Sequence, residues 1–216
     1  VSPGGVGKSY LTLETGLSIA AGQDIFGIWQ ASLASGPVVY LNLEDPGIAL
    51  QHRVRALGRY LQDSYEWGNN DDIDPDAVDW PTICDDFDVY PLVGHNFSVA
   101  RLNEKNVPEI SDTWKTFIEQ MRARSPRVIF LDTLNRAIPG LDENSSGHMS
   151  LVLNALEELA QAVGCAVVVL HHANKQSMVA GTGAEQQAIR GSSALSDNAR
   201  WQANLARMSQ QDAKKR

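Results

Sequence analysis

Residues 2–9 read S-P-G-G-V-G-K-S, and they lead straight into a run of good helix formers that stops at Gly22. The spacing of the apolar residues in that run predicts a helix from Lys8 to about Ala21 that packs on one face. The glycines at positions 4, 5 and 7 allow backbone N–H groups to turn inward around an anion, and the helix N-terminus adds partial positive charge there. The stretch therefore predicts a loop that holds phosphate at the start of a helix.

This loop matches the phosphate-binding pattern G-x-x-x-x-G-K-[ST] with one departure, since Ser2 stands where the first glycine is usual. In such loops the lysine, here Lys8, reaches the β and γ phosphates, and the hydroxyl of the next residue, here Ser9, ligates Mg²⁺. A glycine-rich start can also be a simple turn into a helix, but G-K-S at the head of a long helix favours a nucleotide site. The ATP-binding residues we expect are Pro3, Gly4, Gly5, Val6, Gly7, Lys8, Ser9 and Tyr10.

Three continuous apolar runs further along the chain are typical of strands buried on both faces of a parallel sheet. They are 37–43 (PVVYLNL), 128–131 (VIFL) and 166–170 (AVVVL). Helical patterns lie between and beside them, over 48–61, 107–124 and 147–163, and a further short strand is expected near 88–93. This alternation predicts an α/β domain with a mostly parallel central sheet and helices on both faces.

The net charge of −8 is unevenly distributed along the 216 residues. Ten of the 26 acidic residues lie between Asp63 and Asp88, a stretch without Lys or Arg, and the rest of the chain is nearly neutral. The net charge therefore does not exclude a nucleic-acid partner. We expect the acidic stretch to be a solvated, partly disordered insertion at about 63–88.

The remaining composition is that of an ordinary globular chain rather than a disordered, collagen-like or coiled-coil one. Two cysteines are too few for a disulfide framework, and we expect free thiols. Short apolar runs predict neither a membrane span nor a signal peptide, so we expect a cytoplasmic protein without a membrane partner. The chain starts at Val1 with no room for a strand before the loop, which favours a single domain over 1–216 that is a fragment lacking its first strand.

An acidic residue closes one of the buried strands. Asp132 follows R-V-I-F-L, which places a carboxylate at the carboxyl edge of the sheet, where open α/β sheets bind ligands. There it can hold magnesium through a water molecule. Thr133 and Asn135 follow, so a helix N-cap is the alternative role for Asp132. The phosphate-binding loop favours the metal role.

A second pair of acidic residues follows another apolar strand at the same edge. In Y-L-N-L-E-D-P, Glu44 is nearest the strand end and is favoured to polarise the water that attacks the γ phosphate. Asp45 is its competitor, although the position before Pro46 also suits a helix N-cap. We therefore expect Glu44 to be the catalytic carboxylate.

The strand at 166–170 ends in His171 and His172. No third residue follows them at the spacing of a metal site, and a histidine at a strand end often has only a structural role in the core. Beside a γ phosphate, such a side chain can instead sense the phosphate and pass its presence to the polar, glycine-bearing loop at 173–187.

The order of these motifs resembles the RecA-type ATPase core of the plasmid RepA hexameric replicative helicases, relatives of the DnaB helicases. The most specific part of the resemblance is V-L-H-H-A-N-K at 169–175 together with R-G-S-S-A-L-S-D-N-A-R-W-Q at 190–202. The resemblance implies a RecA-like P-loop NTPase fold. The roles it implies are the Walker A pair for Lys8 and Ser9, the catalytic glutamate for Glu44, the Walker B acid for Asp132 and the γ-phosphate sensor for His172.

The resemblance also implies contacts between subunits and with DNA. Arg200, in A-R-W-Q, corresponds to an arginine finger that acts on the neighbouring subunit's site, and Arg190 is its nearest rival. Lys175 lies in the loop that lines the central channel of such rings, which makes it a candidate for DNA contact. The implied partners are single-stranded DNA and further copies of the chain in a homo-hexamer, and the implied cofactors are ATP and Mg²⁺.

The function implied by this resemblance is that of an ATP-dependent DNA helicase motor core in plasmid-type replication. Hydrolysis at subunit interfaces of the ring would drive translocation along one DNA strand. A RecA-like regulatory ATPase is the first alternative, and it would act on a protein partner without unwinding DNA. A P-loop kinase of small molecules is disfavoured, because no second basic cluster indicates a lid over an acceptor.

Overall fold

The computed structural model describes residues 7–29, 35–66, 79–172 and 194–205. Its centre is a parallel sheet of four strands in the order β2-β1-β5-β6. The strands are β1 (Val38–Asn42), β2 (Phe87–Pro91), β5 (Val128–Asp132) and β6 (Ala166–Leu170). Three of them coincide with the continuous apolar runs of the sequence, which confirms the expected α/β class.

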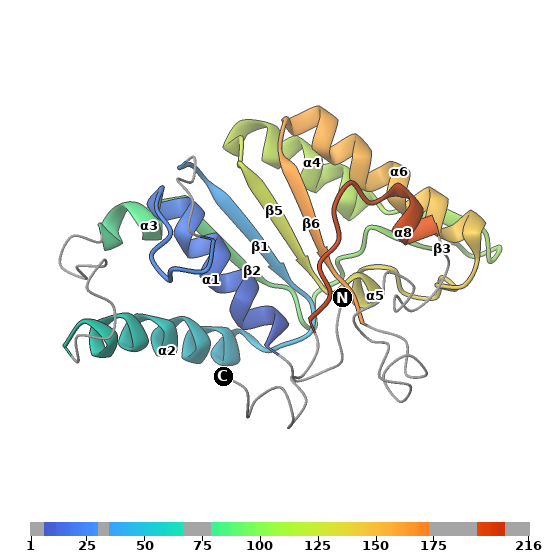
Figure 1. Cartoon of the computed structure of the whole chain (residues 1–216). Coiled ribbons are helices and arrows are strands. Elements are labelled where there is room, and N and C mark those ends of the chain that lie inside the picture. The colour runs from blue at the N-terminus through green and yellow to red at the C-terminus, as the bar shows by residue number, and fades with distance from the viewer. Residues whose placement is uncertain (1–6, 30–34, 67–78, 173–193, 206–216) are drawn as a thin grey trace, which may run out of the picture.

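Helices cover both faces of this sheet (Figure 1). On one face lie α1 (Lys8–Ala21), α2 (Gly47–Glu66) and α3 (Trp80–Asp86), and on the other lie α4 (Asp112–Arg124) and α6 (Ser146–Val163). This arrangement is that of a RecA-like P-loop NTPase domain. Among the described helices, none is both long and apolar enough to cross a membrane.

Side chains alternate along the two central strands and divide the core into two layers. On the α1 face these strands contribute Val38, Tyr40, Val128 and Phe130, and on the α4–α6 face they contribute Val39, Leu41, Ile129 and Leu131. The same alternation places the last residue of each strand, Asn42 and Asp132, on the α1 face. Polar groups at the strand ends therefore face the helix that starts after the glycine-rich loop.

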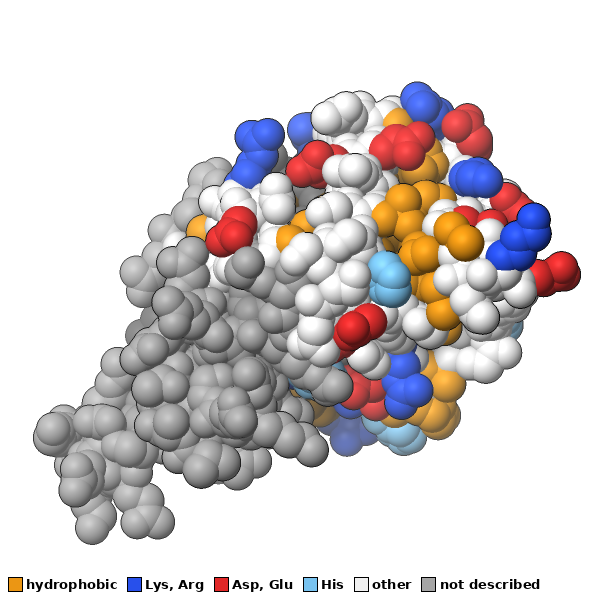
Figure 2. All heavy atoms as spheres, turned by 90° about the vertical axis from the view of Figure 1, so that its right-hand side faces the viewer, with side chains coloured by type: hydrophobic (Ala, Val, Ile, Leu, Met, Phe, Trp, Pro, Cys, Tyr) orange, Lys and Arg blue, Asp and Glu red, His pale blue; other side chains and the backbone are white. Residues whose placement is uncertain are grey.

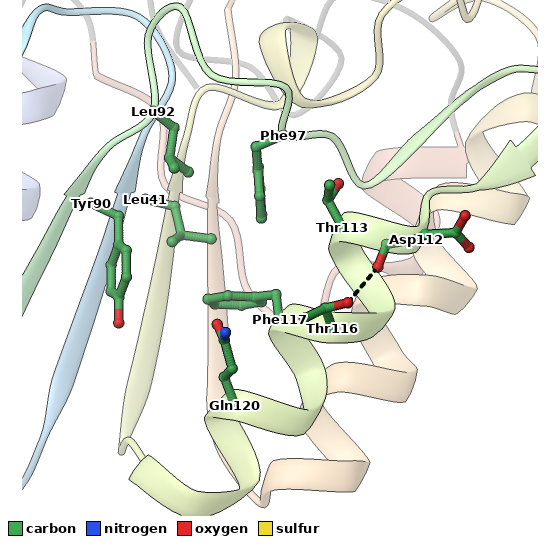
Figure 3. A pocket seen from close by; sticks show the side chains of 9 residues that line it. All are labelled: Leu41, Tyr90, Leu92, Phe97, Asp112, Thr113, Thr116, Phe117 and Gln120. Carbon is green, nitrogen blue, oxygen red and sulfur yellow. Dashed lines mark hydrogen bonds between the residues drawn. The ribbon is translucent and has the colours of Figure 1, made fainter.

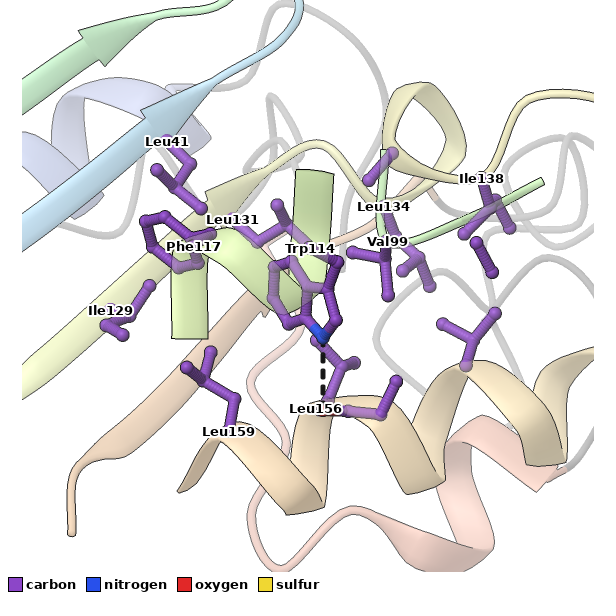
Figure 4. Packing of buried hydrophobic residues seen from close by; sticks show 14 of the residues in the cluster. Leu41, Val99, Trp114, Phe117, Ile129, Leu131, Leu134, Ile138, Leu156 and Leu159 are labelled. Atoms are coloured by element: carbon purple, nitrogen blue, oxygen red, sulfur yellow. Dashed lines mark hydrogen bonds between the residues drawn. The ribbon is translucent and has the colours of Figure 1, made fainter. Parts of the chain in front are cut away.

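The layer under α4 and α6 is organised around Trp114, which is fully buried (Figure 4). Its ring stacks on Phe117, with centroids 5.5 Å apart. Its indole N–H donates to the carbonyl of Ala155 at 3.3 Å, which ties α4 to α6. The packing on this face of the sheet thus does not involve the candidate site.

The helix expected over 107–124 begins later than predicted. Pro108–Ile110 instead forms β4, which pairs antiparallel with β3 (Ala100–Leu102), and Ser111 then caps α4 by accepting the Trp114 backbone N–H at 3.1 Å. Three-residue strands are too short to produce a periodic pattern, so this hairpin could not be predicted. The short helices α5 (Leu134–Ala137) and α8 (Ala194–Asn198) were not predicted either.

The acidic stretch is more ordered at its C-terminal end than expected. Residues 63–66 end α2, and residues 67–78 lie outside the described part of the chain. Asp79 caps α3 by accepting the Thr82 backbone N–H at 3.2 Å, and Ile83 is buried in the layer under α1. Phe87 then begins β2. Residues 79–88 are therefore structured, and Ile83 joins the core, whereas the insertion over 63–88 stays a prediction.

Arg124 at the end of α4 neutralises this end of the acidic stretch. Its guanidinium donates to Asp88 at 2.6 Å and lies 3.7 Å from Asp86. We expect Arg124→Ala to lower the free energy of unfolding by about 1–3 kcal/mol, because charge-assisted hydrogen bonds are lost and two acids lose their cation. Urea denaturation checks this. The control is Lys115→Ala, whose exposed ion pair with Asp112 contributes little to stability. Equal stability of both variants would contradict the role of Arg124.

Candidate active site

The candidate site lies where α1 begins, beside the carboxyl ends of the strands. Gly7 precedes α1 with a φ of 94°, a left-handed conformation that a residue with a Cβ rarely adopts. The turn into α1 therefore requires glycine at this position. The other expected loop residues, Pro3, Gly4, Gly5 and Val6, lie outside the described residues.

Lys8 is the first residue of α1, and only 8% of its surface is exposed. Its Nζ lies 3.5 Å from Nδ1 of His172, just beyond β6. Burial lowers the pKa of Lys8 from its usual value because it disfavours the charged form, whereas the carboxylates of Asp132 and Glu44 act in the opposite direction. The ammonium thus lies among three of the groups predicted to surround the nucleotide.

Asp132 is fully buried at the end of β5. Its Oδ2 accepts a hydrogen bond from the Ser9 hydroxyl at 2.8 Å and a second one from the Tyr40 hydroxyl. Burial and the negative charge of Asp132 raise the pKa of Tyr40 well above its usual value. The phenol therefore stays protonated and is the donor of this hydrogen bond. The N-cap position of α5 belongs to Thr133, which rules out the N-cap alternative for Asp132.

The oxygens of Ser9 and Asp132 fit a magnesium ion. Oδ1 of Asp132 is buried and has no hydrogen-bond partner among the described residues. A buried carboxylate oxygen without a donor is costly, so Oδ1 is suited to accept a further donor or to face a cation. Carboxylate and hydroxyl oxygens are the hard ligands that Mg²⁺ prefers in nucleotide sites, where phosphates and waters complete the coordination. The donor set of Ser9 and Asp132 is therefore suited to the ion.

Glu44 and Asp45, which the sequence left in competition, have different surroundings. Glu44 Oε1 lies 3.6 Å from Nε2 of His172, so the imidazole stands between Glu44 and Lys8. Asp45 instead binds Arg53 of α2, with 2.6 Å between Oδ2 and the guanidinium. Because Asp45 is held by this pair, Glu44 is the carboxylate of the two that is in contact with the other site residues.

Asn42, which sequence reasoning did not single out, fixes the turn that carries Glu44. It is fully buried, and its Oδ1 accepts the backbone N–H groups of Glu44 at 3.2 Å and of Asp45 at 2.8 Å. Tyr40 was missed in the same strand. Both polar side chains interrupt an apolar run at alternate positions, a signal that could have placed them on one face of the sheet.

Arg53 also reaches the start of α1. Its guanidinium carbon lies 5.9 Å from the ring centroid of Tyr10, a cation–π distance. Tyr10, expected to bind ATP, is 41% exposed, so its ring lies at the surface rather than inside the site. Arg53 therefore links α1, through Tyr10, to the turn after β1, through Asp45.

The structure describes only one of the three residues proposed for ring and DNA contacts. Lys175 and Arg190 lie outside the described residues. Arg200 is exposed and follows α8, which packs on α6. Within the described part of the chain, no hydrogen bond or ion pair joins Arg200 to Lys8, Glu44 or Asp132.

A pocket of about 340 Å³ lies on the opposite face of the sheet (Figure 3). Its lining residues come from β1, β2, α4 and the segment between β2 and β3, and they are Leu41, Tyr90, Leu92, Phe97, Asp112, Thr113, Thr116, Phe117 and Gln120. Leu41 belongs to the α4–α6 layer, whereas the candidate site lies on the α1 face. The pocket is therefore separate from the candidate active site.

Comparison with known families agrees with this geometry. The model of the AAA_25 family, described as an AAA domain, matches residues 1–178. The match spans the glycine-rich loop and the segments that contribute Glu44, Asp132 and His172. The chain belongs to the AAA_25 family of AAA domains and is a P-loop ATPase.

Proposed function

We propose that this ATPase is the motor core of a DNA helicase. ATP hydrolysis at subunit interfaces of a homo-hexameric ring moves it along single-stranded DNA in plasmid-type replication. The observation that carries the hydrolytic part is the contact of His172 with both Lys8 and Glu44. The motifs at 169–175 and 190–202 support the helicase part, because together they resemble those of replicative helicases.

In this proposal each side chain of the site has one task in hydrolysis. Lys8 binds the β and γ phosphates and neutralises the charge that develops on them. Ser9 would hold a magnesium ion directly and Asp132 would hold it through water, and the ion would supply positive charge against the phosphates. Glu44 accepts a proton from the attacking water while the water oxygen bonds to the γ phosphorus. The bond between the γ phosphorus and the β–γ bridging oxygen breaks, and ADP is the leaving group.

His172 couples the γ phosphate to the following loop. One ring nitrogen contacts Lys8 and the other contacts Glu44, so a γ phosphate that draws Lys8 away changes the surroundings of the ring. Lys175, three residues further on, transmits the change to the DNA backbone. Arg200 stabilises the charge on the phosphates of the neighbouring subunit, with Arg190 as the rival for that role.

The alternative is a RecA-like regulatory ATPase that acts on a protein partner. The net charge of −8 favours it. So does the side of the molecule that carries α6 and β3, where acidic and basic side chains are mixed and the described residues form no extended basic patch (Figure 2). A DNA channel needs only a few basic groups repeated around a ring, so the helicase proposal is compatible with this charge.

Steady-state ATPase assays across protein concentration, with and without single-stranded DNA, test the proposal. We expect severalfold stimulation by DNA that increases with concentration, because the ring brings the finger of one subunit to the site of the next. Arg200→Ala should abolish this stimulation and Arg190→Ala should retain it; the reverse result would make Arg190 the finger. Intact ATPase activity without DNA binding at low salt would support the regulatory alternative. Activity that depends on neither DNA nor concentration would contradict the ring.

A further inference from the structure

Tyr40 carries a hydroxyl into the middle of an apolar layer. Its side chain is fully buried, and its ring lies 6.3 Å from that of Phe130 on the neighbouring strand. A phenylalanine would fill the same volume under α1 without the cost of burying a polar group. Packing therefore accounts for the ring of Tyr40 but not for its hydroxyl.

The hydroxyl of Tyr40 forms a hydrogen bond with one oxygen of Asp132. It donates to Oδ2, which also accepts the Ser9 hydroxyl, so the two lone pairs of that oxygen are both occupied. Oδ1 of the same carboxylate is buried without a partner among the described residues. One oxygen of the carboxylate thus accepts two hydrogen bonds, and the other accepts none from the described residues.

The two donors to Oδ2 differ in how they respond to a nucleotide. Ser9 belongs to the helix that follows the phosphate-binding loop, and its oxygen is expected to bind magnesium itself. Tyr40 lies in the central strand β1, two residues before Asn42, which is in register with Asp132. Its hydrogen bond therefore comes from the central sheet and not from the helix that follows the loop.

We propose that Tyr40 is a positioning residue for the magnesium site: its hydroxyl holds Oδ2 of Asp132 so that Oδ1 remains free for the hydration shell of the ion. This inference rests on the proposed nucleotide site and adds to it a residue that does not touch the nucleotide. Groups that orient a metal-binding carboxylate commonly change metal affinity when they are removed, even though they are not ligands.

Nucleotide binding measured at a series of Mg²⁺ concentrations tests the proposal, with a fluorescent ATP analogue as the probe. For Tyr40→Phe we expect unchanged affinity in EDTA, where the loop alone holds the phosphates. We expect the half-saturating Mg²⁺ concentration to rise by about 10-fold or more, as is usual when such a group is lost. Excess Mg²⁺ should restore both binding and hydrolysis.

The matched control is Tyr90→Phe, which removes a hydroxyl from the adjacent strand β2. Tyr90 is in register with Leu41 and packs on Phe117, so it lies on the other face of the sheet. This variant should require the same Mg²⁺ concentration as the wild type. Equal Mg²⁺ dependence in Tyr40→Phe and Tyr90→Phe would overturn the positioning role, whereas a wild-type protein that binds no nucleotide would overturn the proposed site itself.

A measurement on the wild type covers the case in which Tyr40→Phe does not fold. The buried Tyr40 hydroxyl proton should give a slowly exchanging NMR signal, which is assigned in the wild type through its proximity to the ring protons of Tyr40. The signal should persist when magnesium and nucleotide are added. Its disappearance on addition would show that the hydrogen bond to Asp132 breaks in the loaded site, and the proposal would then be wrong.

Discussion

Replacing Glu44 with glutamine should slow ATP hydrolysis by about 100- to 10,000-fold, the usual contribution of a general base. Glutamine has the size of glutamate and can still lie near His172, but it cannot accept the proton of the attacking water. Because Glu44 is at the rim of the site, with 39% of its side chain exposed, nucleotide affinity should stay within a few-fold of the wild type. Single-turnover hydrolysis and equilibrium binding, measured on the same preparation, separate the two effects.

The adjacent acid provides the control for this experiment. Asp45→Asn removes the ion pair with Arg53 but leaves Glu44 in place. It should keep most of the hydrolytic rate, with a modest loss of stability. If Asp45→Asn lost the activity and Glu44→Gln kept it, the base would be Asp45, and if both kept it, neither residue would be the base.

The central sheet could be predicted because buried parallel strands are continuous apolar runs. The runs that became β1, β5 and β6 have this property, and their helices have clear periodicity between recognisable stops such as Gly22 and Gly164. The β3–β4 hairpin could not be predicted, because its strands are three residues long and one begins with Pro108. The order at the end of the acidic stretch was missed for another reason. The many acidic residues indicate a solvated segment, although Ile83 among them is buried in the core.

Much of the candidate site followed from where the strands end. The sequence predicts Glu44, Asp132 and His172 at the ends of strands and Lys8 at the head of a helix, and the structure brings the four together. Their chemical roles stay predictions. The hydroxyl of Tyr40 could not be assigned from sequence, because its partner depends on which strand is its neighbour and in what register.

Lys8→Met should reduce ATP hydrolysis by about 100- to 1,000-fold, the usual cost of removing a group that stabilises charge in the transition state. Unlike Glu44→Gln, it should also weaken nucleotide binding, because Lys8 is the cation at the head of α1. Methionine keeps the unbranched stem and removes only the ammonium. Binding and hydrolysis assays together distinguish this pattern from that of the glutamate variant.

The same substitution should not destabilise the nucleotide-free protein. Burial is the largest influence on the pKa of Lys8 and lowers it, which means that holding the ammonium in this site opposes folding despite the neighbouring carboxylates. The melting temperature of Lys8→Met without nucleotide should therefore equal or exceed that of the wild type, as expected where function is maintained at the expense of stability. Lys115→Met on the exposed face of α4 is the control for the substitution itself. A lower melting temperature for Lys8→Met alone would mean that the attraction of Lys8 to Asp132 and Glu44 outweighs the cost of its burial. Normal hydrolysis by Lys8→Met would contradict the assignment of Lys8 as the phosphate-binding lysine.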